Sequence, residues 1–194
     1  GICRKDANFR VYASFSRLFG PSRLLKGMVN ANNLALNRGV TGVHAAEGLG
    51  FPGDSDLKGV LMVAPHLDVE VTTYFQSRDV ERARKYGLPR IGACFSTAVD
   101  GSPSSGTAAF FEPFGPSGGT GTVYFTQEEL DRFVLEAHRA GLQVNLHAIG
   151  DRAIEMALSA MEKAIEAHPR ANHRHRIEHC TFPTRDQVRR IARA

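Results

Sequence analysis

No apolar stretch in the 194-residue sequence reaches the ~18 residues that a membrane-spanning helix requires, so contact with a membrane is not expected. The first ten residues, GICRKDANFR, lack the apolar centre of a signal peptide, and the chain has no starting methionine. These features favour a cytoplasmic chain that is a piece of something longer.

Cysteine is also scarce, because Cys3, Cys94 and Cys180 are odd in number and far apart. No CxxC pair is present, so the sequence indicates neither a disulfide framework nor a cysteine zinc knuckle. The phosphate-binding pattern GxxxxGK[ST] is absent as well, which makes a phosphate-binding barrel the weaker alternative.

The net charge is only +4, and its densest basic runs lie at residues 173–176 and 185–190. We interpret both runs as solvated surface, and a nucleic-acid partner is not expected.

Short runs rich in β-branched residues alternate with amphipathic helical patterns along the chain. The predicted strands are residues 39–46, 67–75, 91–99, 142–149 and 175–180. The predicted helices are residues 29–36, 79–86, 126–141, 151–168 and 184 onward, two of which begin with the capping boxes Thr126-x-x-Glu129 and Thr184-x-x-Gln187. This order predicts an α/β fold with a parallel sheet, in which chemistry gathers at the carboxyl ends of the strands.

A complete (β/α)₈ barrel usually needs about 250 residues, so if the parallel sheet belongs to such a barrel, residues 1–194 are one incomplete barrel domain. Residues 1–28 are a lead-in segment. Residues 100–122 form a long glycine-rich loop after the third strand. A loop of this length at a strand end is typical of a functional element, with a flexible surface excursion as the alternative.

Two histidines occupy equivalent places on consecutive predicted strands. His147 and His179 each lie at a carboxyl end, and neighbouring parallel strands are about 4.8 Å apart. Histidines at matching heights on such strands can share a metal ion, whereas either one alone could simply be hydrogen-bonded. A catalytic zinc site needs a third protein ligand and an open position for water.

Other polar residues are candidates for the same end of the sheet. Asp100 closes the third strand and His44 ends the first, and both are predicted to take part in catalysis. Asp151 is interpreted as a helix cap, and Glu178 should point away from the face that carries His179. Of the other histidines, His66, His138, His168 and His173 are expected at the surface.

The stretches 98–114, 124–158 and 173–180 resemble the amidohydrolase superfamily. The similarity is to the branch of predicted metal-dependent hydrolases that includes N-substituted formamide deformylase, amidohydrolase family 3. It rests on HAIGDRA (147–153) followed by HRIEH (175–179), and it extends over roughly residues 30–194. The resemblance implies a partial TIM-like (β/α) barrel holding about strands two to six of eight.

The resemblance also implies one or two divalent metals, most commonly zinc, with His147 and His179 as ligands. The family's His-x-His pair of the first strand and its aspartate of the eighth strand are missing from this sequence. Ser96 stands where members often carry a lysine whose carbamate bridges two metals, which favours a mononuclear site or another bridging group.

From this resemblance we expect a hydrolase that acts on C–N bonds of amide-like or cyclic amide small molecules through a metal-activated water. The chain alone is expected to be inactive or nearly so. The alternative is a non-catalytic remnant or small-molecule-binding fragment without metal. Exposed sheet edges would also favour a homo-oligomer.

Overall fold

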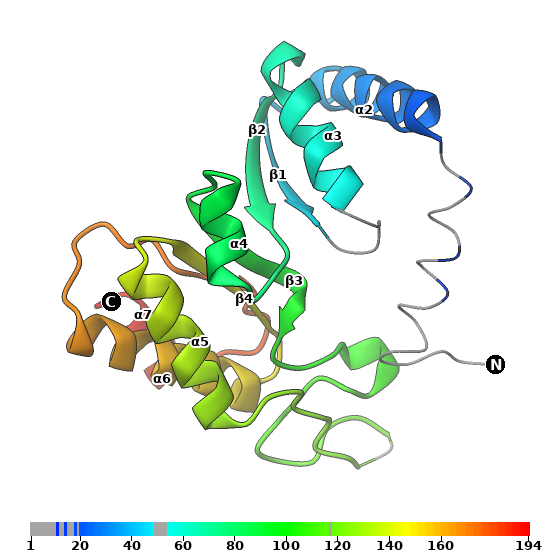
Figure 1. The fold of residues 1–194 in the computed structure, drawn as a ribbon. Coiled ribbons are helices and arrows are strands. Elements are labelled where there is room, and N and C mark those ends of the chain that lie inside the picture. Colours follow the sequence, from blue (N-terminus) through cyan, green and yellow to red (C-terminus); the bar gives the residue numbers. More distant parts are fainter. Residues whose placement is uncertain (1–10, 12–13, 15–17, 19, 49–53, 117) are drawn as a thin grey trace. The chain divides into compact units, whose positions relative to one another are not determined.

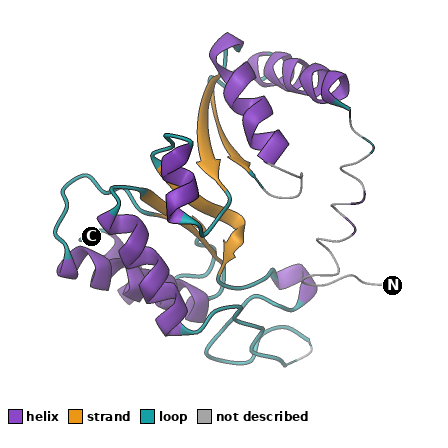
Figure 2. Ribbon diagram, viewed as in Figure 1, coloured by secondary structure: helices purple, strands orange, loops and turns teal. Residues whose placement is uncertain are grey.

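The computed structural model describes residues 11, 14, 18, 20–48, 54–116 and 118–194, which are coloured in Figure 1. The chain divides into two compact units, residues 1–75 and 76–194. In each unit, parallel strands alternate with helices (Figure 2), as the sequence predicts. In the part of the chain that is described, no helix is long and apolar enough to cross a membrane.

The first unit pairs two parallel strands. Its described elements are α2 (Pro21–Leu36), β1 (Gly42–Glu47), α3 (Ser55–Val63), the 3₁₀ turn η2 (Ala64–His66) and β2 (Glu70–Phe75). The ladder runs in register from Gly42 opposite Glu70 to Glu47 opposite Phe75. The buried Asn32 accepts a hydrogen bond of 3.1 Å from the N–H of Val69, which ties α2 to the start of β2.

The second unit carries three parallel strands with β4 in the middle. Its elements are α4 (Val80–Lys85), β3 (Arg90–Ala98), the 3₁₀ turn η3 (Pro103–Ser105), α5 (Gln127–Arg139), β4 (Gln143–Ala148), α6 (Asp151–Ala167), β5 (Arg176–His179) and α7 (Arg185–Ile191). Helices α5 and α6 pack against each other and against β4 (Figure 1).

The core of the second unit follows the predicted helical and strand periods. The apolar stripes of α5 and α6 are buried, as are alternate residues of β4: Leu130, Phe133, Val134, Ala137, Val144, Leu146, Ala148, Ile154, Ala157 and Met161. Burying a large aliphatic or aromatic side chain contributes about 1.5–3 kcal/mol, so this layer contributes strongly to the stability of the second unit. Asn145 and His147 alternate with the buried apolar residues and therefore lie on the other face of β4.

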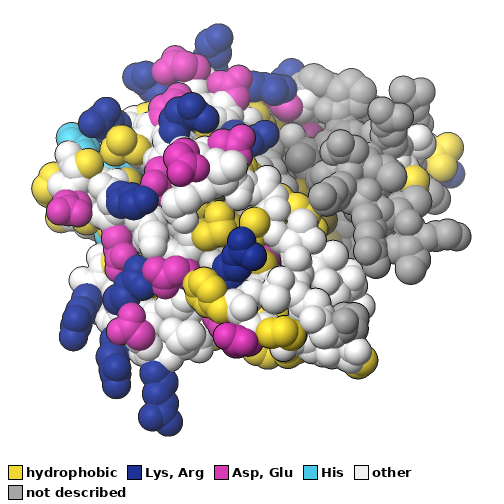
Figure 3. Space-filling view, turned by 90° about the horizontal axis from the view of Figure 1, so that it is seen from below, with side chains coloured by type: hydrophobic (Ala, Val, Ile, Leu, Met, Phe, Trp, Pro, Cys, Tyr) yellow, Lys and Arg dark blue, Asp and Glu magenta, His cyan; other side chains and the backbone are white. Residues whose placement is uncertain are grey.

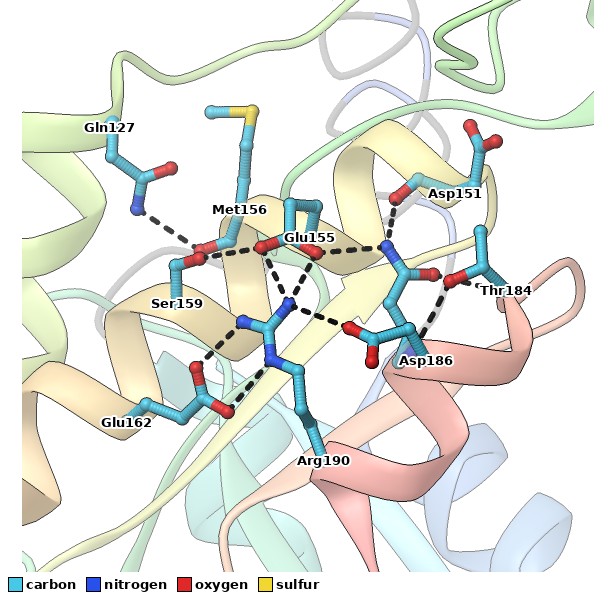
Figure 4. A network of polar contacts seen from close by, with 10 residues as sticks. Gln127, Asp151, Glu155, Met156, Ser159, Glu162, Thr184, Asp186 and Arg190 are labelled. Atoms are coloured by element: carbon cyan, nitrogen blue, oxygen red, sulfur yellow. Dashed lines mark hydrogen bonds and ion pairs between the residues drawn. The ribbon is translucent and has the colours of Figure 1, made fainter.

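Both predicted capping boxes are present, at the N-termini of α5 and α7. Helix α7 is held on α6 by a polar network that Figure 4 shows. The guanidinium of Arg190 donates to both carboxylate oxygens of Glu155 at 2.8 Å and to those of Glu162 at 3.0 and 2.7 Å. Gln187, only 2% exposed, donates to the backbone oxygen of Asp151 at 2.8 Å. Charge-assisted, two-pronged bonds of this kind fix one helix against another.

The prediction that His138 lies at the surface is wrong, because its side chain is 0% exposed. It belongs to a chain of hydrogen bonds near the start of β4. The N–H of Val144 donates to Nδ1 of His175 at 3.0 Å, so Nε2–H of His175 donates to Nδ1 of His138 at 2.8 Å. Nε2–H of His138 then donates to the backbone oxygen of His168 at 2.7 Å. Burial, reinforced by His173 and His138, lowers the pKa of His175 to about 3, so both rings of the chain are neutral.

The lead-in segment, helix α3 and the 100–122 loop differ from what the sequence predicts. Residues 1–10 of the lead-in lie outside the described residues, and α2 already begins at Pro21, inside the predicted lead-in. Helix α3 was not predicted, because the run GVLMVAP (59–65) shows no clear helical period. The loop 100–122 is partly ordered by η3 and by a bridge between Phe114 and Gly119.

Acidic and basic side chains lie intermingled on the face of the molecule that Figure 3 shows. The basic runs are only partly solvated surface, because Arg190 is bound to two glutamates and His175 belongs to the hydrogen-bond chain with His138.

Candidate metal centre

The two predicted histidines meet at the carboxyl ends of β4 and β5. The ring centroids of His147 and His179 are 4.6 Å apart, with an angle of 72° between the rings. The expectation of matching heights is wrong by one residue, because His147 pairs with Glu178 and His179 pairs with Ala148. The rings still meet because the strand ends at His179, where φ is +67°, followed by +44° at Cys180. This left-handed turn breaks the alternation of side chains.

The same register corrects the orientation of Glu178. It lies beside Asn145, whose Nδ2 donates to Oε1 of Glu178 at 2.9 Å, and Nη2 of Arg176 lies 2.9 Å from the same oxygen. Glu178 therefore shares the face of Asn145 and His147 instead of pointing away from the site. Its charge acts on both His147 and Cys94.

One ring nitrogen of His147 is available to bind an electrophile such as a metal ion. Its Nε2 lies 3.3 Å from the backbone oxygen of Gly101, and since a carbonyl can only accept, Nε2 carries the hydrogen. Nδ1 then has a free lone pair, is buried, and has no hydrogen-bond partner among the described residues. Burial lowers the pKa of His147, and His179 lowers it further, so the ring is neutral near pH 7. A neutral imidazole whose other nitrogen is held by a carbonyl is the usual state of a metal-ligating histidine.

A third donor, Cys94 on β3, completes the cluster. Ligand atoms of Cys94, His147 and His179 all lie within 4.8 Å of one another, and this is the one group of three found within the described ranges. Sγ of Cys94 is 3.8 Å from Nε2 of His179. Burial raises the pKa of the Cys94 thiol, and the charge of Glu178 adds to the effect. The donor set of two imidazoles and a thiol fits zinc well.

The sequence analysis did not identify Cys94 as a candidate ligand, because the period of two in a regular strand does not bring Cys94 to the strand end where the histidines lie. One signal was available in Gly92, since an isolated glycine within a strand pattern indicates a bulge. Gly92 has φ of +93°, and a Cβ there would lie 2.1 Å from the backbone oxygen of Asn145. The chain is therefore distorted immediately before Cys94.

Asp100 lies beside His147 and is 0% exposed. Its Oδ2 accepts the N–H of Ala109 at 2.8 Å and of Gly150 at 2.9 Å, and its Oδ1 accepts the N–H of Ile149 at 3.0 Å. Oδ1 is also 3.5 Å from Nε2 of His147. One carboxylate thus joins the start of the 100–122 loop, the end of β4 and the ring of His147. Its predicted part in catalysis stays a prediction.

The long loop is fixed against the strand ends at several points. Gly150 lies so close to the loop that a Cβ there would be 1.9 Å from the backbone oxygen of Ala109. Asp151 was predicted to cap α6, but the N-cap is Gly150, and Asp151 instead accepts the N–H of Phe111 at 3.0 Å. Aromatic rings of Phe110, Phe114 and Phe182 pack together, with centroids 4.3 to 5.6 Å apart. Residues 109–111 and 114 of the loop are therefore packed onto the strand-end surface.

His44 does not end its strand, contrary to prediction, because it is the third of six residues in β1 and the ladder continues to Glu47. Its ring is stacked on Tyr74 within the first unit, with centroids 5.5 Å apart. A catalytic role for His44 stays a prediction. Ser96, on β3, has a buried Oγ without a hydrogen-bond partner among the described residues, and a hydroxyl cannot form a carbamate.

Comparison with known proteins gives one consistent family. The amidohydrolase family is matched over residues 2–194. The protein LONG AFTER FAR-RED 3 of Arabidopsis thaliana is 30% identical over 173 residues, which are 79% of this chain and 29% of that protein. The putative amidohydrolase YtcJ of Bacillus subtilis (strain 168) is 36% identical over 97 residues, or 49% of this chain and 18% of that protein. The chain spans less than a third of the length of either relative.

Two solved structures share the fold. An uncharacterized metal-dependent hydrolase from Pyrococcus horikoshii OT3 superposes with a TM-score of 0.70 at 24% identity, covering 91% of this chain and 36% of its own. Another from Pyrococcus furiosus gives 0.68 at 25% identity, covering 90% and 37%. The predicted fold class, an α/β fold corresponding to part of a TIM-like barrel, is confirmed.

Proposed function

The chain belongs to the amidohydrolase family, and from this membership we propose that it forms part of a metal-dependent hydrolase acting on C–N bonds of amide-like or cyclic amide substrates. The single observation that carries the proposal is the lone pair of His147 Nδ1. This nitrogen is buried and unpartnered among the described residues, and His147 belongs to a cluster with His179. A buried nitrogen without a partner is costly unless something binds it.

When bound, a divalent metal would lower the pKa of a water molecule toward about 7 and polarise the carbonyl of the substrate. The protein residues hold and orient the site. His147 and His179 present imidazole nitrogens, and Gly101 keeps the hydrogen of His147 on Nε2. We infer that zinc is the metal, because nitrogen donors from neutral imidazole suit it.

We propose that Asp100 is a positioning residue. Its two oxygens already accept three backbone N–H groups, so little capacity remains for taking a proton from water. Through those bonds it holds the end of β4 and the loop, and at 3.5 Å it favours the Nε2–H form of His147.

The proposal is tested by metal content and amide hydrolysis of the purified protein. We expect about one zinc per chain by elemental mass spectrometry, lost in His147→Ala and in His179→Ala but kept in His44→Ala. Any amine release from N-benzylformamide, or ring opening of a hydantoin, that the protein catalyses should require zinc. Absence of stoichiometric metal under zinc loading would contradict the proposal and favour a non-catalytic binding fragment.

Three further attributes stand as proposals. The substrate is a small molecule, the protein is cytoplasmic, and it self-associates through exposed sheet edges. Light scattering tests the last of these, and a monodisperse monomer would contradict it.

A further inference from the structure

Strand β3 contains an unusually large bulge next to the candidate metal centre. Ala93 pairs with Leu146 and Ala98 pairs with His147, so residues 94–97 lie between consecutive rungs of the ladder. A simple bulge inserts one residue into one strand. Here four residues, including Cys94, leave the regular ladder.

Hydrogen bonds of a buried side chain hold the bulge in shape. Thr97 is 0% exposed, and its Oγ1 accepts the N–H of Ala93 at 2.9 Å. The same oxygen lies 2.7 Å from the backbone oxygen of Ala93 and 2.8 Å from that of Asn145. Outside, the N–H of Phe95 donates to Oε1 of Gln76 at 3.0 Å. Ala93 has φ of +138°, a costly conformation for a residue with a Cβ. Such strain persists where several surrounding hydrogen bonds together fix the backbone in that conformation.

The effect of the bulge is to aim Cys94 at the two histidines. Its Sγ lies 3.8 Å from Nε2 of His179. In a tetrahedral zinc site with ordinary bond lengths, a sulfur and a nitrogen ligand are about 3.5 Å apart. The observed separation is therefore close to that of two ligands of one ion. It also lies at the upper limit for a thiol–imidazole hydrogen bond.

We propose that Cys94 is a sulfur ligand, so that Cys94, His147 and His179 form a mononuclear thiolate–imidazole centre selective for zinc and similar soft divalent ions. The inference rests on the proposed metal-dependent function and specifies its metal. A second observation supports it independently of the cysteine, namely the buried Nδ1 of His147 without a partner among the described residues. Thiolate donors select zinc, cobalt and cadmium, whereas magnesium and manganese prefer oxygen donors. Ser96 cannot supply the carbamate that would bridge a second metal.

Cobalt(II) titration of the metal-free protein tests the ligand directly, because a thiolate–cobalt bond gives a charge-transfer band in the near ultraviolet. We expect this band at one equivalent of cobalt, together with visible bands of a tetrahedral ion. Zinc should displace the cobalt, while a large excess of magnesium should not. The variant Cys94→Ser should lose the charge-transfer band and bind zinc at least about 100-fold more weakly. Removing a group that only hydrogen-bonds to a metal ligand already weakens metal binding by up to about 100-fold, and a direct ligand should matter at least as much.

Cys180→Ser is the matched control. Cys180 is the residue after His179 and is also half-buried, but it is not in the ligand cluster. It should leave the cobalt spectrum unchanged, and circular dichroism should show that both variants fold. A wild-type cobalt complex without the charge-transfer band would overturn the proposal even if Cys94→Ser failed to fold.

The outcomes separate this inference from the function on which it rests. Cobalt binding that needs His147 and His179 but is unaffected by Cys94→Ser would refute the sulfur ligand and leave the hydrolase proposal standing. No cobalt binding at any concentration would refute both.

Discussion

Replacement of Asp100 should loosen the strand ends that carry the candidate metal centre. The carboxylate is 0% exposed and accepts three backbone N–H groups from Ala109, Ile149 and Gly150. Leaving a buried donor unsatisfied costs about 1–3 kcal/mol, so Asp100→Ala should lower the free energy of unfolding by at least about 3 kcal/mol. That is a large share of the ~5–15 kcal/mol that stabilises a typical domain.

Asp100→Asn gives a graded version of the same test. The amide oxygen can keep the two donors that meet Oδ2, but the amide nitrogen faces the N–H of Ile149 and repels it. We expect Asp100→Asn to lower the free energy of unfolding by about 1–3 kcal/mol, which is less than the effect of Asp100→Ala. The exposed Asp68 offers a control, since Asp68→Asn should change stability by less than about 0.5 kcal/mol.

Urea unfolding followed by circular dichroism gives the overall effect, and amide hydrogen exchange gives the local one. The amides of Ala109, Ile149 and Gly150 should exchange faster in both variants, ahead of the core amides of β4. Unchanged protection of these three amides in Asp100→Ala would refute the role assigned to the carboxylate.

Three further outcomes follow from the second unit. The folded state lowers the pKa of His175 to about 3 and also lowers that of His138, so both neutral rings stabilise the folded state fully above pH 6.5. Their contribution falls as the pH drops below 6.5, by up to about 1.4 kcal/mol per pH unit for each proton that only the unfolded chain binds. A His175 ring that gains its proton between pH 7 and pH 5 in an NMR titration of the folded protein would contradict this prediction. Arg190→Ala should lower the free energy of unfolding by about 1–2 kcal/mol, because it releases α7 from two glutamates on α6. Arg189→Ala, at an exposed site, should change the free energy of unfolding little. Equal urea midpoints for the two variants would argue against the network. Gly121→Ala should open the 100–122 loop, because φ is +74° and the new Cβ would lie 1.8 Å from a carbonyl oxygen, and limited proteolysis should then cut that loop faster than in the wild type.

Local signals predicted the fold well where one short pattern decides the structure. The capping boxes at Thr126 and Thr184 fixed helix starts to within a residue, because the reciprocal bonds involve only four neighbouring positions. The proximity of His147 and His179 at the carboxyl ends of neighbouring strands was also predictable from the alternation of strands and helices.

The rest depended on contacts between distant residues. His138 reads as an exposed helix residue until His175, 37 positions later, supplies its partner. The role of Cys94 depends on a bulge closed by Thr97, which interrupts the period of two on which strand predictions rely. Positive φ at His179 has the same effect at the end of β5. Regular patterns predict regular elements, and the candidate site is built where the pattern is broken.

X-ray absorption at the zinc edge of the zinc-loaded protein tests the central claim most directly. Cys94, His147 and His179 predict a first shell with one sulfur at about 2.3 Å and two imidazole nitrogens at about 2.0–2.1 Å, with any remaining position filled by oxygen. A shell of oxygen and nitrogen without sulfur would contradict the thiolate centre. A shell without imidazole scattering would contradict the metal site as a whole.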